Sequence, residues 1–303
     1  MSFVHLHVHS HGSLLDGAQT TDTIAQRIKE LGQPAVALTD HGNMHMAMHF
    51  VKSCQKENVK PIVGQEFYMT QGSRHTKKPV DGKRPPLFHL TILAMNQQGL
   101  DNLYRLSSLG FTEGFYYKPR IDCELLEQYS DGLIGLSGCI QGYVQQLAMM
   151  SFTLEDPDEA LEFNVKAKKQ IQYFQEAFDG RFYLELQRVG LDHDMLLTKK
   201  LIELGQEANC KCVATCDAHY ARKEDAEFHD QLVAIATGKT LKDKDRLSML
   251  DCELYLKSTE EMRELFSDFP EAVANTLEVA NQCEEVTLTR EGHRFPQVSE
   301  DDK

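Results

Sequence analysis

The sequence contains no tryptophan, only 9 prolines, and no apolar run long enough to cross a bilayer. Its first residues also lack the basic start and apolar stretch of a signal peptide. We therefore expect a cytoplasmic protein that does not enter a membrane. Basic residues are few, since 32 lysines and arginines stand against 46 acidic residues, a net charge of −14. This balance argues against a broad phosphate-neutralising surface, so bound metal would have to supply much of the positive charge for a nucleic-acid substrate.

Cysteine pairs with regular spacing are also missing, so the 8 cysteines do not predict a disulfide framework. We expect most of them to be reduced and buried. Cys210, Cys212 and Cys216 could suggest a zinc site, but their place in an apolar strand favours core thiols. With 303 residues, 41% of them hydrophobic, the chain can bury a large core, and one large domain is the first expectation.

Short β-rich runs alternate with helical patterns, which is typical of a parallel sheet covered by helices. The predicted strands are residues 3–9, 35–39, 61–69, 88–94, 133–136, 181–186 and 211–215. The predicted helices are residues 21–31, 43–57, 97–109, 158–178, 191–208 and 221–236. Seven strand–helix repeats favour an α/β barrel over residues 1–237, although a doubly wound open sheet fits the pattern too. We expect residues 238–303 to form a small helical appendage packed on the barrel, with a disordered tail near 299–303.

Histidines stand at alternate positions at the start of the chain: His5, His7, His9 and His11. Side chains alternate between the two faces of a strand, so these four imidazoles would share one face and could bind a metal. A His-rich tag or a solvated face is the alternative. Further potential ligands follow the later strands. They are Asp16, Asp40, His41, Glu66, His89, Cys139, Glu185, Asp217 and His219. Because function in barrels gathers at the carboxyl ends of strands, they predict one metal centre there.

These residues lie in a recognisable series of motifs. The HxH of His7 and His9 is followed by SLLDG, TDHGN, GQEFY, FHLTILA, EGFYYKPRID, LSGC and CDAHY. The series resembles the PHP (polymerase and histidinol phosphatase) domain over nearly the whole chain. It is most similar to the version at the N-terminus of bacterial DNA polymerase III alpha subunits. The resemblance implies a distorted seven-stranded, TIM-like barrel with three divalent metal ions, which could be zinc, manganese or iron.

The resemblance also implies which residues bind each ion. His7, His9, Glu66 and Asp217 would hold the first, and Glu66 would bridge to a second held by His89 and Cys139. Asp16, His41 and His219 would hold the third. All nine positions are intact, which favours a working enzyme. Two metals can share a water and lower its pKa, so a hydroxide near Glu66 would attack the phosphorus atom of a phosphoester.

For this branch of the family the implied reaction is 3′→5′ exonuclease cleavage at a DNA 3′ end, as in proofreading. One alternative is a small-molecule phosphatase of the histidinol phosphate type. The other is a non-catalytic barrel, stapled by its metals, that serves as a scaffold for a polymerase and its proofreading partners. The chain shows neither a Gly-rich nucleotide segment nor paired palm aspartates, so we expect that it cannot copy DNA. It would be either part of a longer polymerase alpha subunit or a free-standing relative, and a proofreading subunit could bind to it.

Several neighbouring residues have two interpretations each. Arg120 could contact a phosphate, or it could pair with Asp122 or Glu124. His5 and Asp40 are expected behind the ligands, in hydrogen bonds that orient them, with direct metal ligation as the alternative for His5. His11 is expected at the mouth of the site, Glu185 as a lining or supporting residue, His45 and His49 as structural residues, and Arg74, Lys77, Lys78, Lys83 and Arg84 as a mobile solvated loop rather than a nucleic-acid contact.

Overall fold

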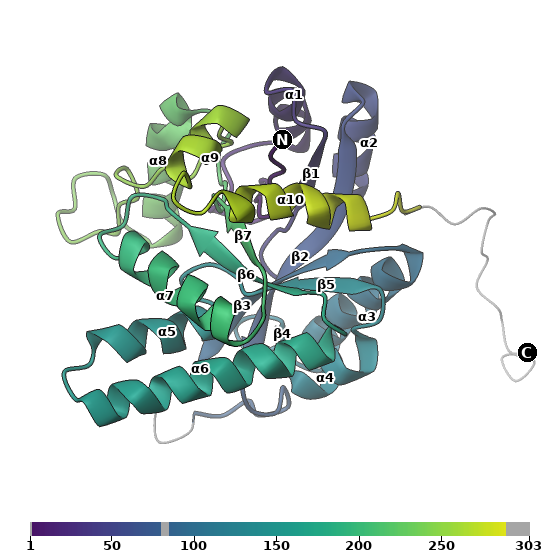
Figure 1. Ribbon diagram of the computed structural model, residues 1–303. Helices are drawn as coiled ribbons and strands as arrows, with labels where there is room; N and C mark the ends of the chain where they lie inside the picture. Colours follow the sequence, from purple (N-terminus) through teal and green to yellow (C-terminus); the bar gives the residue numbers. More distant parts are fainter. Residues whose placement is uncertain (1, 80–84, 289–303) are drawn as a thin grey trace, which may run out of the picture.

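The computed structural model describes residues 2–79 and 85–288. Its strands, in chain order, are β1 (Ala35–Leu38), β2 (Lys60–Thr70), β3 (Leu87–Ala94), β4 (Arg120–Ile121), β5 (Leu133–Leu136), β6 (Phe182–Gln187) and β7 (Cys212–Thr215). They form one curled sheet in the order β1-β2-β3-β5-β6-β7, with β4 paired to β2 (Figure 1). Six of the seven predicted strands correspond to β1, β2, β3, β5, β6 and β7.

The predicted first strand is not a continuous strand, but its residues join the two edges of the sheet. His5 bridges to Val36 of β1, and Val8 bridges to Ala218 just after β7. Backbone hydrogen bonds run on both sides, from Ala37 N to the His5 carbonyl (2.8 Å) and from His9 N to the Ala218 carbonyl (2.8 Å). The sheet therefore closes into a distorted barrel, which confirms the predicted α/β barrel.

The expectation of a parallel sheet is wrong for one strand. β3 runs antiparallel to both β2 and β5, whereas β1–β2, β5–β6 and β6–β7 are parallel. The described part of the connection between β2 and β3 contains no helix. A helical crossover is the usual way to bring the chain back for a parallel pairing, and without one the neighbouring strand returns antiparallel.

Helices cover the outside of the barrel. They are α1 (Thr21–Glu30), α2 (Ala47–Glu57), α3 (Gln97–Thr112), α4 (Cys123–Tyr129), α5 (Tyr143–Thr153), α6 (Pro157–Ala177), α7 (Asp194–Glu207), η1 (Lys223–Asp225), α8 (Ala226–Ala236), α9 (Thr259–Leu265) and α10 (Pro270–Gln282). The sequence pattern missed α4 and α5, and it began the second helix four residues early. Side-chain caps start several of them, as at Thr20, Asn96 and Asp156. Within the described ranges, no helix is both long and apolar enough to span a membrane.

One end of the barrel is filled by apolar side chains and closed by α10, which crosses β7 in Figure 1. This cluster consists of Val4, Leu6, Ala35, Ala37, Ile62, Leu93, Ile134, Leu136, Tyr183, Val213, Val279, Ala280 and Cys283. Polar contacts fasten the helix, since Asn275 Nδ2 donates to the Cys212 carbonyl (2.8 Å) and the backbone N–H of Val4 donates to Thr276 Oγ1 (3.1 Å). The functional residues therefore have only the opposite end of the barrel available.

The described residues after 237 pack on the barrel through α10, while the domain boundary at 237 stays a prediction. The tail 299–303 lies outside the described residues, as do Lys83 and Arg84. All eight cysteines are free thiols, and only Cys123 is not fully buried. Cys210, Cys212 and Cys216 are core residues, as expected.

Candidate metal centre

The alternation of histidines at the start of the chain is broken by a bend at His7. His5 turns away from the other imidazoles: its Nε2 donates to the Lys257 carbonyl (2.9 Å) and its ring packs on Phe3. His7 and His9 point into the open end of the barrel, with their Nε2 atoms 3.1 Å apart. The expectation of four imidazoles on one face is therefore wrong, and so is a direct hydrogen bond from His5 to a ligand.

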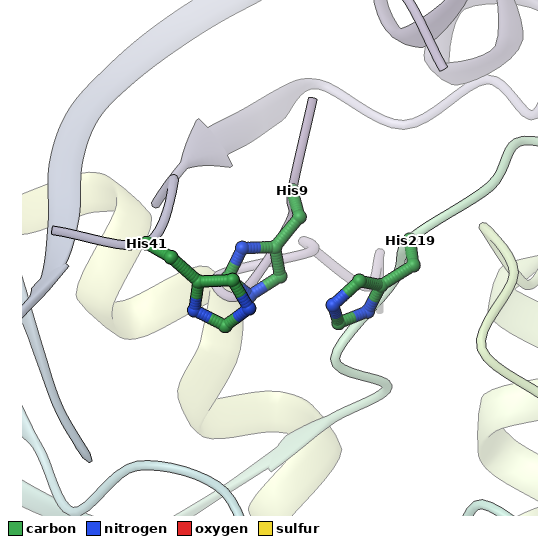
Figure 2. A group of neighbouring side chains, drawn as sticks. All are labelled: His9, His41 and His219. Carbon is green, nitrogen blue, oxygen red and sulfur yellow. The ribbon is translucent and has the colours of Figure 1, made fainter. Parts of the chain in front are cut away.

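The nine ligand candidates all lie at this end of the barrel. Three overlapping groups have ligand atoms within 4.8 Å of one another: His9–His41–His219, His7–His9–Glu66 and His41–Glu66–His89. Figure 2 shows His9, His41 and His219 reaching into the same space from three separate segments. The first-to-last separation of these residues in sequence exceeds 200 positions, so the fold alone brings them together.

Glu66 of β2 is the centre of the cluster. Its Oε1 lies 2.8 Å from His89 Nδ1 and 3.5 Å from His7 Nε2. Its Oε2 contacts His41 Nδ1 and lies 3.9 Å from His9 Nε2. A carboxylate whose two oxygens face different sets of imidazoles can bridge two cations. The division implied by the resemblance, with His7 and His9 on one ion and His89 on the other, stays a prediction, because Oε1 faces both His7 and His89.

Asp217 faces His7 and His9, whereas Asp16 faces His41 and His219. Asp217 Oδ1 is 3.3 Å from His7 Nε2 and 3.1 Å from His9 Nε2. Its backbone has φ 50°, a left-handed conformation that Asp tolerates better than most residues and that is common at functional sites. Asp16 Oδ2 is 2.7 Å from His41 Nε2 and 3.4 Å from His219 Nε2.

Cys139 reaches the cluster because of the glycine before it. Its Sγ is 3.4 Å from His89 Nδ1. Gly138 has φ 84°, and a Cβ there would lie 2.7 Å from the His89 carbonyl oxygen. Only glycine fits this turn without strain, so the LSGC motif places the thiol against His89.

Three of the imidazoles have their Nδ1 atoms tied to acceptors behind them. His7 Nδ1 donates to Glu185 Oε1 (2.8 Å), His9 Nδ1 to Ser13 Oγ (3.0 Å), and His219 Nδ1 to the Asp217 carbonyl (2.7 Å). Each bond keeps a hydrogen on Nδ1, so that Nε2 is the ring nitrogen that faces the cluster and can bind a cation.

The acceptors behind the ligands are themselves held in place. Glu185 also accepts from Gly138 N and Thr215 Oγ1, both at 2.8 Å, so it has the expected supporting role. Asp40 was expected to bond an imidazole directly, and it does not. It accepts from Ser13 Oγ (2.8 Å), and Ser13 in turn accepts from His9, so a serine that the sequence reading missed stands between them.

Charges in the cluster shift the pKa values strongly. Burial, together with the neighbouring imidazoles of His41 and His219, lowers the pKa of His9 to about 3. Burial alone would also lower the pKa of His41, but Glu66 and Asp16 outweigh it and raise this pKa to about 10. Burial and then the Glu66 carboxylate raise the pKa of the Cys139 thiol well above its ordinary range. A cation bound here has to displace protons from His41 and Cys139.

The cluster has the properties of a site for divalent cations. Burial disfavours a charge on His7, but the carboxylates of Glu185 and Asp217 outweigh it and raise the pKa of His7 well above its ordinary range. In the metal-free protein His7 Nε2 therefore carries a proton toward His9 Nε2, 3.1 Å away, in the space that a cation would take. Buried Glu66 Oε2 and Asp217 Oδ1 face imidazole nitrogens and have no other hydrogen-bond partner. The mixture of imidazole, carboxylate and thiolate suits zinc-like, manganese or iron ions.

A cavity of about 650 Å³ opens beside the cluster. Five ligand candidates are among its lining residues: Asp16, His41, His89, Cys139 and Asp217. The lining also includes Tyr68, Phe111 and Lys118, and the Lys118 ammonium lies 5.0 Å from the centre of the Tyr68 ring. Many of the other lining residues are apolar, such as Val189, Leu201, Val233 and Leu254. A phosphate beside the ligand candidates could therefore carry an apolar or aromatic group into the cavity.

Both interpretations of Arg120 are wrong. The side chain is fully buried, and its guanidinium donates to the carbonyls of Gly114 (2.8 Å), Arg74 (2.6 Å) and Thr76 (2.9 Å). It fastens two loops together and cannot reach a substrate. Arg74 makes the expected pairs instead: its guanidinium binds Glu113, Asp122 and Glu124.

His11, His45 and His49 belong to none of the ligand groups. His11 is exposed, bonds the Gln19 carbonyl and does not line the cavity, which corrects its expected place. His45 and His49 are exposed as well, and His45 lines the cavity. Arg74 is buried rather than solvated, while Lys77 and Lys78 are exposed.

Much of this sequence is shared with known proteins. The model of the family described as "PHP domain" matches residues 5–189. DNA polymerase III subunit alpha of Borreliella burgdorferi is 42% identical over 97% of this chain and 25% of its own length. The Helicobacter pylori protein of that name (strain 26695) is 41% identical over 93% and 23%, and the Treponema pallidum protein is 41% identical over 98% and 24%.

This chain thus spans about a quarter of the length of the curated relatives it matches. Asp217 and His219 lie beyond the region matched by the family model, but within the sequence shared with the relatives. The predicted resemblance is confirmed, and the chain belongs to the PHP domain family.

Proposed function

We propose that this chain is a metal-dependent phosphoesterase that removes nucleotides from a DNA 3′ end in the 3′→5′ direction. The observation that carries the proposal is the convergence of nine ligand candidates around Glu66 at the open end of the barrel. Membership of the PHP family supports a hydrolase, and the names of the relatives support a role within a DNA polymerase.

Three divalent ions would be shared among these residues. The first would be held by His7, His9, Glu66 and Asp217, the second by Glu66, His89 and Cys139, and the third by Asp16, His41 and His219. When bound, such ions supply a water of lowered pKa and offset the charge that develops on the phosphate and the leaving oxygen.

The chain's own residues prepare this site for the reaction. Glu185 and Ser13 fix His7 and His9 before any ion arrives, so little reorganisation is needed on binding. The apolar lining residues Val189, Leu201 and Leu254 limit water beside the phosphate, and electrostatic interactions are stronger where water is excluded.

The lining of the cavity supports a nucleotide as the substrate. Phe111, which is 41% exposed, offers a ring face on which a base can stack, and Lys118, held over the buried Tyr68 ring, offers a cation to a neighbouring phosphate. The acidic chain otherwise presents little positive charge, so strand capture would depend on these two residues and on the bound ions. The rest of a polymerase alpha subunit and a proofreading subunit are the proposed partners.

The proposal is tested by cleavage with known metal content. The protein is loaded with Mn²⁺, Zn²⁺, Mg²⁺, Co²⁺ or Fe²⁺ and incubated with end-labelled single-stranded DNA and with duplexes that carry a 3′ mismatch. The same preparations are given a generic phosphodiester and histidinol phosphate. We expect stepwise shortening from the 3′ end, and loss of this activity in Asp16→Asn and His89→Ala.

His49→Ala is the matched control, because His49 is an exposed histidine outside the ligand groups. It should keep the activity and the metal content of the wild type. Cleavage of the phosphomonoester alone would favour the histidinol phosphate type of activity. Bound ions without cleavage of any substrate would leave the barrel as a metal-stapled scaffold and overturn the proposal.

A further inference from the structure

His229 is a buried histidine that no other part of the site uses. It lies in the first turn of α8, its side chain has no exposed surface, and neither ring nitrogen has a hydrogen-bond partner. Buried polar atoms are nearly always paired, because an unpaired one has lost its hydrogen bonds to water and destabilises the fold. An imidazole kept here without partners suggests a function that is not complete in the metal-free protein.

The nearest charged group is a proposed ligand of the third ion. His229 Nε2 lies 3.7 Å from Asp16 Oδ1. The other oxygen of the same carboxylate, Oδ2, faces His41 Nε2 (2.7 Å) and His219 Nε2 (3.4 Å). His229 thus stands behind Asp16, on the side away from the imidazoles that would share the ion.

The position of the His229 ring is fixed by its surroundings. It packs between the rings of His219 (centroids 5.4 Å apart) and Tyr220 (5.3 Å). The next residue, Asp230, accepts hydrogen bonds from Arg246 and Ser248, which fasten the loop after α8 to the helix. The imidazole therefore cannot move far, whereas the half-exposed Asp16 can rotate about its side-chain bonds.

We propose that His229 is a positioning residue for the third metal site. Its Nε2–H donates to Asp16 Oδ1 after a small rotation that shortens the 3.7 Å separation to the usual N–H···O distance of about 2.9 Å. This bond keeps Oδ2 turned toward His41 and His219, as partners behind metal ligands commonly do. The inference rests on the proposed three-ion centre.

The test compares a variant that keeps the donor with one that removes it. In His229→Gln the side-chain amide can place an N–H near the position of Nε2, whereas His229→Phe fills the space with no donor. The control is His193→Phe, because His193 lines the same cavity and also has a buried, unpaired Nε2, but has no carboxylate ligand beside it. Ion stoichiometry and affinity are measured by titrating Mn²⁺ into the metal-free proteins, and thermal unfolding of the metal-free proteins is recorded.

We expect the wild type and His193→Phe to bind three ions, and His229→Gln to bind all three within a few-fold of the wild type. His229→Phe should bind one of the three, the ion at Asp16, about 10- to 100-fold more weakly and the other two unchanged. The metal-free Phe variant should not unfold earlier than the wild type, because two unpaired buried nitrogens have been removed.

Three results would overturn the inference. The first is wild-type affinity for all three ions in His229→Phe, and the second is a loss of ion affinity in His229→Gln that equals the loss in His229→Phe. The third is an unfolding temperature of metal-free His229→Phe well below that of the wild type, which would indicate a packing role. His229→Leu repeats the comparison with a smaller side chain. If the wild type itself binds fewer than three ions, the proposed centre fails, and not merely the role of His229.

Discussion

Replacing Glu185 with glutamine should loosen the metal centre without changing any proposed ligand. The Glu185 carboxylate accepts three hydrogen bonds in the barrel interior, from His7 Nδ1, Thr215 Oγ1 and Gly138 N, each 2.8 Å long. It therefore holds His7 directly, and it also holds the turn that presents Cys139. A glutamine has the same shape but offers one oxygen and one NH₂ group in place of two oxygens.

The cost can be worked out from these contacts. If the amide oxygen keeps the bonds from His7 and Thr215, the NH₂ group faces the N–H of Gly138, and two buried donors meet with no acceptor. The loss of one charge-assisted bond and the burial of unpaired donors should together lower the free energy of unfolding by roughly 3 to 5 kcal/mol. Affinity for the ion at His7 should fall about 10- to 100-fold.

Chemical denaturation of the metal-free protein and Mn²⁺ titration measure the two effects separately. Thr215→Val removes one donor but leaves the bonds from His7 and Gly138, so it should cost about 1 kcal/mol and leave ion affinity nearly unchanged. If Glu185→Gln unfolds and binds ions as the wild type does, Glu185 does not orient His7 and the reasoning is wrong.

Three further changes have distinct outcomes. Ser13→Ala leaves His9 Nδ1 and the backbone N–H of His41 unpaired, and it should lower the free energy of unfolding by roughly 2 to 4 kcal/mol in chemical denaturation. Ser151→Ala is the control: this hydroxyl donates to the Ala148 carbonyl, and its loss should lower the free energy of unfolding by under about 1 kcal/mol. Arg120→Lys cannot reach all three carbonyls and should lower stability by roughly 2 to 4 kcal/mol, while a raised KM for DNA at unchanged stability would restore a substrate role. Burial lowers the pKa of His5 from 6.5 to about 4, so the unfolded chain takes up the proton more readily between these values. The contribution of His5 to the free energy of unfolding is complete above pH 6.5, and roughly 3 kcal/mol of it should be lost as the pH drops to 4. In His5→Gln, measured in parallel, the free energy of unfolding should lack this loss.

Most of the ligand candidates were accessible from the sequence because they follow strands whose carboxyl ends meet at one end of a barrel, as His41, Cys139 and Asp217 follow β1, β5 and β7. His89 departs from this rule: it lies near the start of β3, and it reaches the cluster because β3 runs antiparallel to its neighbours. The motif series added the division into three ions, which spacing alone does not give. The division itself stays a prediction until bound ions are counted.

What the sequence did not reveal depends on contacts between distant segments. The alternating histidines gave no sign of the bend at His7, which turns His5 toward Lys257. Arg120 has the type and setting of a phosphate ligand, and only the fold shows that carbonyls surround it. Ser13 and His229 carry no ligand spacing, so their roles appear only once His9 and Asp16 are placed beside them.

The most direct test of the account is to locate bound ions by anomalous X-ray scattering from crystals grown with Mn²⁺ or Zn²⁺. The account predicts three peaks at the open end of the barrel, two of them on either side of Glu66 and the third beside Asp16, His41 and His219. A single peak, or peaks remote from Glu66, would contradict the three-ion centre and the phosphoesterase mechanism built on it.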